Sequence, residues 1–299
     1  MFIVSLCLLM KPLHYILTSL FAGVLLQVLC GGIRPSVVAF PLNVSIIFAL
    51  LATLWVVEGE WGEKTAVRTF RSPRMACSLL IAVGIWCVLG GLTPQMPIPD
   101  DATLLHRFAA FWGLNKFPTS YPFVVLLLLL LTHLSLVIIH RLRQRAWRRD
   151  VPFLLLHGGL WLALVGGMAG SADAVEGRII VARQAPTRSA YDAYGREITL
   201  PYTLRLTDFH VTRHEADHSP VQYEATLLID DMPQSLAVNS PCGVRLFEDL
   251  YLLNYFSEDD TDQADAVLLL MVRNPWKPAV LGGILLLLLG TGWQLFRLK

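Results

Sequence analysis

The chain has 299 residues, of which 55% are hydrophobic and only 16% charged, and its formal net charge is +1. Its mean hydropathy of +0.55 is too high for a water-soluble globule. Composition therefore excludes the soluble class and indicates a membrane protein, so the first question is how many times the chain crosses the bilayer.

Six stretches are long and apolar enough to cross about 30 Å of hydrocarbon as helices. The first could instead be a signal peptide, because Lys11 precedes an apolar stretch, but residues 1–10 are themselves apolar and no small-residue cleavage site follows. We therefore predict an uncleaved first span and a polytopic α-helical membrane protein. The six predicted spans cover residues 12–31, 43–57 (extendable to Phe40), 76–93, 121–140, 151–170 and 278–296.

Lys and Arg cluster in three short segments, and cationic loops of this kind stay in the cytoplasm. Both termini are then cytoplasmic, and the long stretch from Ser171 to about Asn274 lies on the outer face. The cations are Lys64, Arg68, Arg71 and Arg74 between spans two and three, Arg141, Arg143, Arg145, Arg148 and Arg149 between spans four and five, and Arg297 and Lys299 after span six.

The outer stretch changes character. It contains EGRIIVAR, ITLPYTLRLTDFHV, VQYEATLLID, QSLAVN, VRLFEDLYLLNYF and AVLLLMV, which are rich in β-branched and aromatic residues and separated by turns such as DAYGRE, DDMP and NSPCG. We predict one extracytoplasmic antiparallel β-domain of about 100 residues, enough to bury a modest core. The expected domains are 1–60 (spans one and two), 72–170 (spans three to five), 171–275 (β-domain) and 276–299 (last span).

Two histidines lie within predicted spans, where an ionisable side chain is costly and is a functional candidate. His133 precedes His140 by seven residues and His157 follows Val151 by six, so we expect both imidazoles roughly 10 Å from the cytoplasmic side. A neutral imidazole can ligate haem iron from a span, and a pair, or one with a partner's histidine, gives six-coordinate iron. The alternative is that each imidazole hydrogen-bonds a neighbouring helix.

Small residues follow His157 along the fifth span. They let another helix, or a flat macrocycle, approach the backbone closely. These residues are Gly158, Gly159, Gly166, Gly167 and Gly170.

A second group of histidines lies in the outer stretch. His210, His214 and His218 are spaced four apart, which on a helix would suit a metal. The segment RLTDFHV alternates like a strand, however, and on a strand about 13 Å would separate the first two. We interpret this group as a strand end and a loop.

The five cysteines contain no C-x-x-C pair, which argues against a thiol–disulfide oxidoreductase or a zinc ribbon. Cys242 stands alone in the outer domain. We expect a free or buried thiol there, with a mixed disulfide to a partner as the alternative.

Longer segments carry a family resemblance. SPRMACSLLIAVGIWCVLGGLTPQ, TSYPFVVLLLLLLTHLSLV, the basic loop and LLLHGGLWLALVGGMAGSADAVEGRIIVA follow one another, and LPYTLRLTDFHV, VNSPCGVRLFEDLYLLNYF and VRNPWKPAVLGGILLLLLGTGW come later. Together they resemble the ResB (CcsB) family of system II cytochrome c biogenesis proteins over roughly residues 72–297. The sequence departs from the family where Asn274 replaces an Asp and Phe247-Glu248 replaces a tyrosine–glutamine pair.

The resemblance implies an accessory, non-catalytic subunit of a cytochrome c haem lyase in a bacterial inner (cytoplasmic) membrane. Such a subunit pairs with a ResC (CcsA) protein that carries a WWD segment, which this chain lacks. The complex moves haem b across the membrane, binding it transiently, and joins it to apocytochrome c. Besides these partners and the lipid bilayer, no nucleic acid is expected.

The resemblance also assigns residues. The family's intramembrane histidine falls on His157, which would be an axial ligand of the haem iron, with the second ligand from the partner and His133 as the fallback. Arg141, Arg143 and Arg145 lie just below that depth and would either hold haem propionates or only set topology.

Two other functions remain open. One is a stand-alone b-type haem electron carrier that uses His133 and His157 together. The other is a non-catalytic membrane scaffold that presents its β-domain to a secreted client, in which both histidines would be replaceable.

Overall fold

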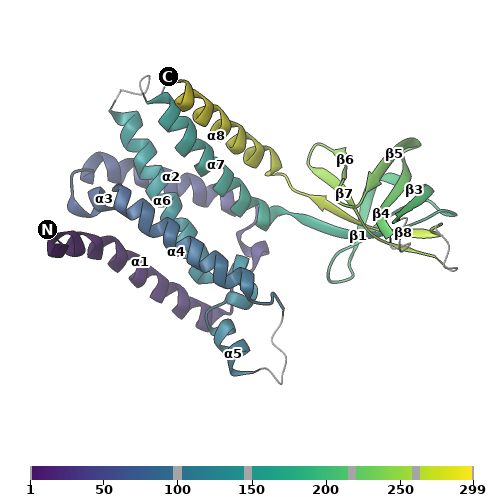
Figure 1. Ribbon diagram of the computed structural model, residues 1–299, viewed down its shortest axis with the longest axis horizontal. Coiled ribbons are helices and arrows are strands. Elements are labelled where there is room, and N and C mark those ends of the chain that lie inside the picture. The colour runs from purple at the N-terminus through teal and green to yellow at the C-terminus, as the bar shows by residue number, and fades with distance from the viewer. Residues whose placement is uncertain (1, 97–102, 145–149, 215–219, 258–262, 298–299) are drawn as a thin grey trace. The chain divides into compact units, whose positions relative to one another are not determined.

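A computed structural model of the chain describes residues 2–96, 103–144, 150–214, 220–257 and 263–297, without the side chains of residues 2–11, 213, 220 and 297. The chain divides into two compact units. One contains Met1–Ala172 and Ala279–Lys299 and is helical, and the other, Asp173–Pro278, is a β-sheet (Figure 1).

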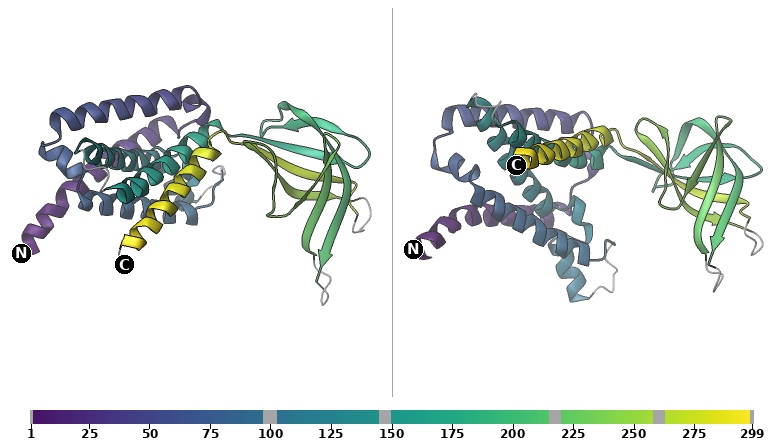
Figure 2. Two further views of the ribbon diagram at one scale, coloured as in Figure 1. Left: turned by 90° about the horizontal axis from the view of Figure 1, so that it is seen from above. Right: turned by 45° about the horizontal axis from the view of Figure 1, so that its top comes forward.

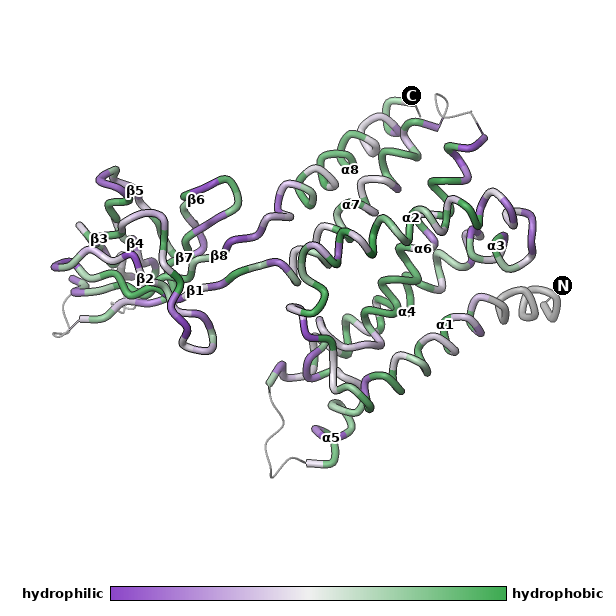
Figure 3. The backbone as a smooth tube through the Cα atoms, turned by 180° about the vertical axis from the view of Figure 1, so that it is seen from behind, coloured by the Kyte–Doolittle hydropathy of each residue, from purple (hydrophilic) through white to green (hydrophobic). Residues whose placement is uncertain are grey.

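The helical unit confirms the prediction of a polytopic membrane protein. Six of its described helices are long and apolar enough to span a bilayer, and they are hydrophobic along most of their length (Figure 3). They are α1 (Phe2–Cys30), α2 (Leu42–Trp61), α4 (Pro73–Leu92), α6 (Tyr121–Arg143), α7 (Val151–Asp173) and α8 (Lys277–Arg297). Shorter helices are α3 (Thr65–Phe70), α5 (Leu104–Phe111), η1 (Pro35–Val38) and η2 (Leu114–Thr119).

Helix α2 extends further than the sequence predicts. The expected span ended at residue 57, before two glutamates, but the helix continues to Trp61. It continues because Glu58 is buried and ion-paired, so its charge does not end the helix.

Helix α6 is the centre of the helical unit. Half of its most apolar stretch is buried, compared with 11–22% in each of the other five spans. Leu126, Leu130 and Leu134 pack there with Ile16 of α1 and Met75 of α4. The first span therefore shares this core with α4 and α6, whereas Leu54 of the second span packs against Leu136 and Ile139 of α6 in a separate cluster.

Helices α7 and α8 pack through glycine. A Cβ atom on Gly159 would lie 2.7 Å from the carbonyl oxygen of Gly283, and one on Gly283 would lie 2.6 Å from that of Gly159. A Cβ on Gly290 would lie 3.0 Å from the amide nitrogen of Leu156. The backbones therefore approach more closely than any side chain would allow, as small residues permit between membrane helices.

The β unit is a single antiparallel sheet, which confirms the predicted fold class. Its strand order is β5-β4-β3-β2-β1-β8-β7-β6. The first strand pairs with the last, from Val175 opposite Arg273 to Ala182 opposite Ala266. The strands are β1 (Val175–Ala182), β2 (Thr187–Tyr191), β3 (Glu197–Arg213), β4 (Pro220–Ile229), β5 (Met232–Ala237), β6 (Cys242–Arg245), β7 (Glu248–Phe256) and β8 (Ala266–Arg273).

The sheet curls around one core (Figure 2). Along β8 the buried residues alternate, and Val267, Leu269 and Met271 are fully inaccessible. Strand β5 also contacts β6 and β7, so the two ends of the sheet approach each other. Curling lets the apolar face bury itself without a second layer.

A buried carboxylate fixes β3, β7 and β8 to one another. Glu248 is 1% exposed, accepts a hydrogen bond from the hydroxyl of Tyr202 and pairs with Nε of Arg273 at 2.6 Å. Burial and then the neighbouring carboxylate raise the pKa of the Tyr202 phenol, which therefore remains a donor. Glu248 is one of the positions where the sequence departs from the ResB family. Its buried carboxylate is accompanied by two partners, Tyr202 and Arg273.

The chain enters and leaves this unit at a second set of contacts. Nε1 of Trp276 donates to Asp173 at 2.6 Å, and Nζ of Lys277 lies 2.5 Å from Asp249. The side-chain oxygen Oδ1 of Asn274 accepts a hydrogen bond from the backbone N–H of Trp276. The backbone N–H of Asn274 donates to the carbonyl oxygen of Phe247. The side chain of Asn274 therefore serves as a turn cap, a role its side-chain oxygen can fill as an Asp would.

We expect Gly159→Ala and Gly158→Ala to differ although the residues are adjacent. The Cβ at residue 159 meets backbone, so overpacking should destabilise the helical unit by about 1–3 kcal/mol. The Cβ at residue 158 meets no described atom within 4 Å, and the gain in helix propensity should leave stability unchanged or raised by up to about 1 kcal/mol. Thermal unfolding midpoints in detergent would contradict this packing if the two variants behaved alike.

Tyr202→Phe should destabilise the sheet by about 1–3 kcal/mol, because it removes a donor from a buried carboxylate. The check is hydrogen exchange of the β3 and β7 amides, with the exposed Tyr194→Phe as the control.

The same phenol gives a pH dependence with a definite sign. An acid whose pKa is raised on folding binds its proton more tightly in the native state, so its contribution is lost above the unfolded pKa of about 10. The Tyr202→Phe variant should lose less stability than the wild type above that pH, and an equal loss would contradict the assigned hydrogen bond.

Candidate functional site

The two predicted intramembrane histidines lie on consecutive spans, His133 on α6 and His157 on α7. His133 is 4% exposed, whereas His157 is only half-buried. A ligand can therefore reach His157 more easily than His133.

The contacts between α6 and α7 set the level of each histidine along the two helices. Phe153 lies under Arg141, and Trp161 donates to Ser135 at 2.8 Å, so His157 is level with the middle of that stretch of α6. His133 lies beyond Ser135, roughly 7 Å further along α6 at 1.5 Å per residue. Similar depth of the two imidazoles in the bilayer stays a prediction.

One nitrogen of His157 is fixed by its own helix. Nδ1 lies 2.9 Å from the carbonyl oxygen of Phe153, and the two rings stack with their centroids 3.8 Å apart. A carbonyl oxygen can only accept, so Nδ1 carries the proton and Nε2 of the neutral ring has a free lone pair. Nothing among the described residues donates a hydrogen bond to Nε2.

This arrangement is that of a metal-ligating histidine. Such side chains almost always donate their other N–H to a backbone carbonyl or carboxylate, which fixes the tautomer and the ring orientation. The Phe153 carbonyl supplies that acceptor, and the Phe153 ring restricts rotation of the imidazole.

The glycines beside His157 divide into two groups. Gly159 and Gly166 are covered by α8, so they serve helix packing. A Cβ atom added to Gly158 would meet no described atom within 4 Å, so α7 carries a surface of bare backbone next to His157; Gly167 is equally open but lies about 15 Å further along the helix. A flat apolar macrocycle could contact this surface closely.

His133 has a different environment. Its Nδ1 lies 2.5 Å from the carbonyl oxygen of Phe70, the last residue of α3. The imidazole thereby satisfies a carbonyl at a helix end and ties α3 to α6, as polar residues do within membrane bundles.

A buried ionic cluster lies among α2, α6 and the turn after α3, and the sequence reasoning did not find it. Oε1 of Glu58 accepts hydrogen bonds from Arg71 and from Nδ1 of His140, the latter at 2.7 Å. Arg71 also donates to the carbonyl of Gly62 at 2.8 Å, and Gln144 contacts Nε2 of His140. The cluster joins α2 and the turn after α3 to α6. The sequence signal that could have indicated this cluster is Glu58 itself, a carboxylate directly after the apolar run of the second span.

The other predicted positions form no second site. His210 lies on β3 opposite Glu224, as the strand interpretation predicts, while His218 lies outside the described residues. Within the described ranges, no group of three His, Cys, Asp or Glu side chains could hold a metal.

Cys242 is a free, buried thiol whose pKa is raised by burial and then by Asp249, so it is neutral at pH 7.

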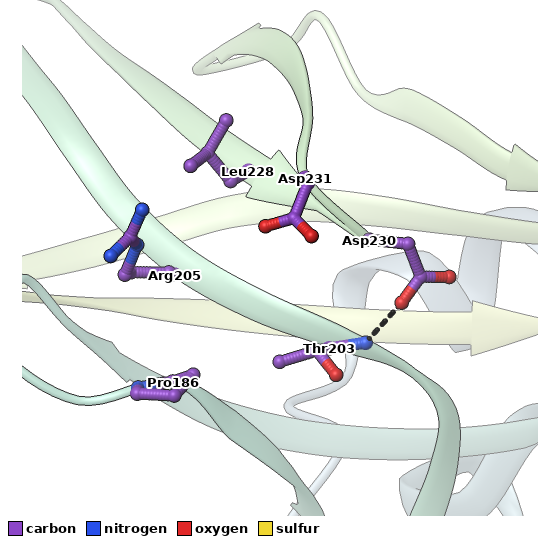
Figure 4. Close-up of a pocket in the computed structure, with 6 residues that line it drawn as sticks. All are labelled: Pro186, Thr203, Arg205, Leu228, Asp230 and Asp231. Carbon is purple, nitrogen blue, oxygen red and sulfur yellow. Dashed lines mark hydrogen bonds between the residues drawn. The ribbon is translucent and has the colours of Figure 1, made fainter.

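The β unit also contains a pocket of about 310 Å³ (Figure 4). The backbone amide of Thr203 donates to Asp230 there, which anchors the β4–β5 turn. The lining side chains carry no imidazole or aromatic ring that would suit a porphyrin. They are Pro186, Thr203, Arg205, Leu228, Asp230 and Asp231.

Of the predicted cations, Arg145, Arg148, Arg149 and Lys299 lie outside the described residues, as does the side chain of Arg297. Arg141 and Arg143 are described, and each lies over an aromatic ring: Arg141 over Phe153 and Arg143 over Trp55.

Fold and site together define a multi-pass membrane protein with an appended β-sheet and a partly accessible imidazole between two spans. The model of the ResB-like family matches residues 146–258, which include α7 with His157 and the sheet as far as β7. The chain is ResB-like over this region, and the predicted resemblance to the ResB (CcsB) family of cytochrome c biogenesis proteins is confirmed.

One solved structure aligns with this chain. The structure, titled cytochrome c haem lyase CcmF, aligns with 16% identity and a TM-score of 0.36. The alignment covers 84% of this chain and 44% of that one, so this chain spans less than half of its length. Comparison with curated proteins gave no match.

We expect Glu58→Ala to destabilise the helical unit by about 3–5 kcal/mol, because Arg71 is 12% exposed and would lose its carboxylate. Glu60→Ala is the control, since Glu60 is on the same helix and exposed. Equal unfolding midpoints for the two variants in detergent would contradict the buried cluster.

Proposed function

We propose that the chain is the ResB-like subunit of a complex that moves haem across the membrane and supports its attachment to apocytochrome c. The observation that carries this proposal is the state of His157 within the family-matched helix α7. Its Nδ1 is held by the Phe153 carbonyl while Nε2 has no described partner.

Haem would be cargo at this site. Its iron accepts a neutral imidazole as an axial ligand, and its largely apolar ring could contact the Phe153 ring and the bare α7 backbone at Gly158. The chain's own contribution is to present Nε2 in a fixed tautomer and orientation. Half-burial of His157 is compatible with transient binding, because the site is open on one side.

The second axial ligand would come from a ResC (CcsA)-like partner with a WWD segment. His133 is the fallback: its Nδ1 is likewise held by a backbone carbonyl, that of Phe70, but the side chain is buried. Attachment to the Cys-x-x-Cys-His segment of apocytochrome c would take place on the partner, so we assign no catalytic residue to this chain.

The proposed location is a bacterial cytoplasmic membrane with both termini inside and the β-domain outside. The described cations support this orientation, since Arg71 and Arg74 before α4 and Arg141 and Arg143 at the end of α6 belong to loops on the same side.

A stand-alone b-type haem carrier is the second candidate, favoured by the position of His133 and His157 on consecutive spans, each with its Nδ1 held by a backbone carbonyl. It requires both imidazoles to ligate one iron, and the Phe70 bond of His133 would have to coexist with that role. Loss of haem on removing His133 would favour this candidate.

The test is His157→Ala in cells that also express the partner. The affinity of the complex for haem should fall by at least about 100-fold, because removal of a ligand costs more than the loss of an outer-shell group, and cytochrome c maturation should fail. Added imidazole, which can fill the vacated position, should partly restore the haem spectrum.

His106→Ala is the matched control, since His106 is exposed on α5. Unchanged haem content and maturation in the His157 variant would reject the proposal and leave the scaffold function.

A further inference from the structure

We infer that Arg141 binds a carboxylate of the haem held by His157, an inference that rests on the proposed function. Arg141 and His157 come from different helices but contact the same side chain. The guanidinium carbon of Arg141 lies 5.1 Å from the centroid of the Phe153 ring, on which the His157 imidazole stacks at 3.8 Å. The cation is therefore beside the metal-binding imidazole.

The guanidinium has donors to spare. Its NH1 group lies 3.3 Å from Oδ2 of Asp150, longer than the roughly 2.7–2.9 Å of a good charge-assisted hydrogen bond. In the described part of the chain no other group accepts a hydrogen bond from Arg141. Its side chain is 40% exposed, so a ligand can reach the remaining N–H groups.

The neighbouring cations are committed elsewhere. Arg143 donates to the backbone oxygen of Trp55 at 3.1 Å and lies over the Trp55 ring. Arg71 is bound to Glu58 and to the carbonyl of Gly62. Among the described cations at this end of the bundle, Arg141 alone shares an aromatic contact with His157.

The chemistry matches the two ends of the ligand. A planar guanidinium presents paired N–H donors that fit a carboxylate, and its cation–π contact with Phe153 holds the group beside His157. Haem carries carboxylates at one edge of an apolar ring. Arg141 therefore orients the bound ring and selects porphyrins with free carboxylates, and Asp150 releases the guanidinium when the carboxylate arrives.

The experiment compares two porphyrins on the purified full-length chain in lipid nanodiscs. Haem and haem dimethyl ester, which has no free carboxylate, are titrated against the wild type, Arg141→Gln, Arg143→Gln and His157→Ala, with the Soret band as the readout. Arg141→Gln should weaken haem binding about 10-fold and leave ester binding unchanged. Arg143→Gln, which removes the same charge two residues away, should change neither.

Equal haem affinity for Arg141→Gln and the wild type would overturn the inference, and so would an equal loss for haem and its ester. In both results His157-dependent binding would persist, so the proposed function would stand. Loss of the His157 dependence itself, with both porphyrins binding the His157→Ala variant normally, would overturn the proposed function and this inference together.

Discussion

Each ring nitrogen of an imidazole buried between apolar helices must find a partner, because no water is available to satisfy it. In His157 one nitrogen is satisfied by the carbonyl four residues earlier, so the helix itself determines the tautomer. The other nitrogen points away from any described partner. In His140 both nitrogens have partners, Glu58 and Gln144, and Nδ1 of His133 is bound to the carbonyl of Phe70 in α3, so these contacts tie α6 to α2 and α3.

The packing around α7 supports the different roles of His157 and of the two histidines on α6. Glycines bring α8 against one face of α7, which leaves the face with Phe153, His157 and Trp161 directed toward α6. On α6, Ser135 and Arg141 contact that face. Helix α2 is joined to α6 by the buried carboxylate of Glu58, and α1 packs on α6 through apolar side chains, so the part of the chain outside the family match contributes to the framework around α6.

Much of the fold was predictable because hydrophobic length and alternation are strong signals. Six spans and an antiparallel sheet followed from them directly. Strand β2 was missed because TRSAY is short and polar, and the segment VRLFEDLYLLNYF was expected as one strand although it turns after Arg245 to form β6 and β7. Both errors arise where tertiary pairing, rather than local pattern, decides the structure.

The site was predictable only in part. A histidine within a span is visible in a sequence, and its glycine neighbours are too, but which glycine faces a helix and which is bare depends on the α7–α8 register. The bond from Nδ1 of His157 to Phe153 needs only a helix, and could have been inferred. The Glu58 cluster joins residues 82 positions apart in the chain, which no local pattern reveals.

The central claim is that His157 is a neutral imidazole protonated on Nδ1, with Nε2 free to bind iron. Solid-state 15N NMR of histidine-labelled protein in lipid bilayers reports this directly, with the signal assigned by its absence in a His157→Asn variant. The account predicts a protonated Nδ1 and an unprotonated Nε2 whose resonance is lost or strongly shifted when haem is added. A proton on Nε2, or an Nε2 signal indifferent to haem, would contradict it.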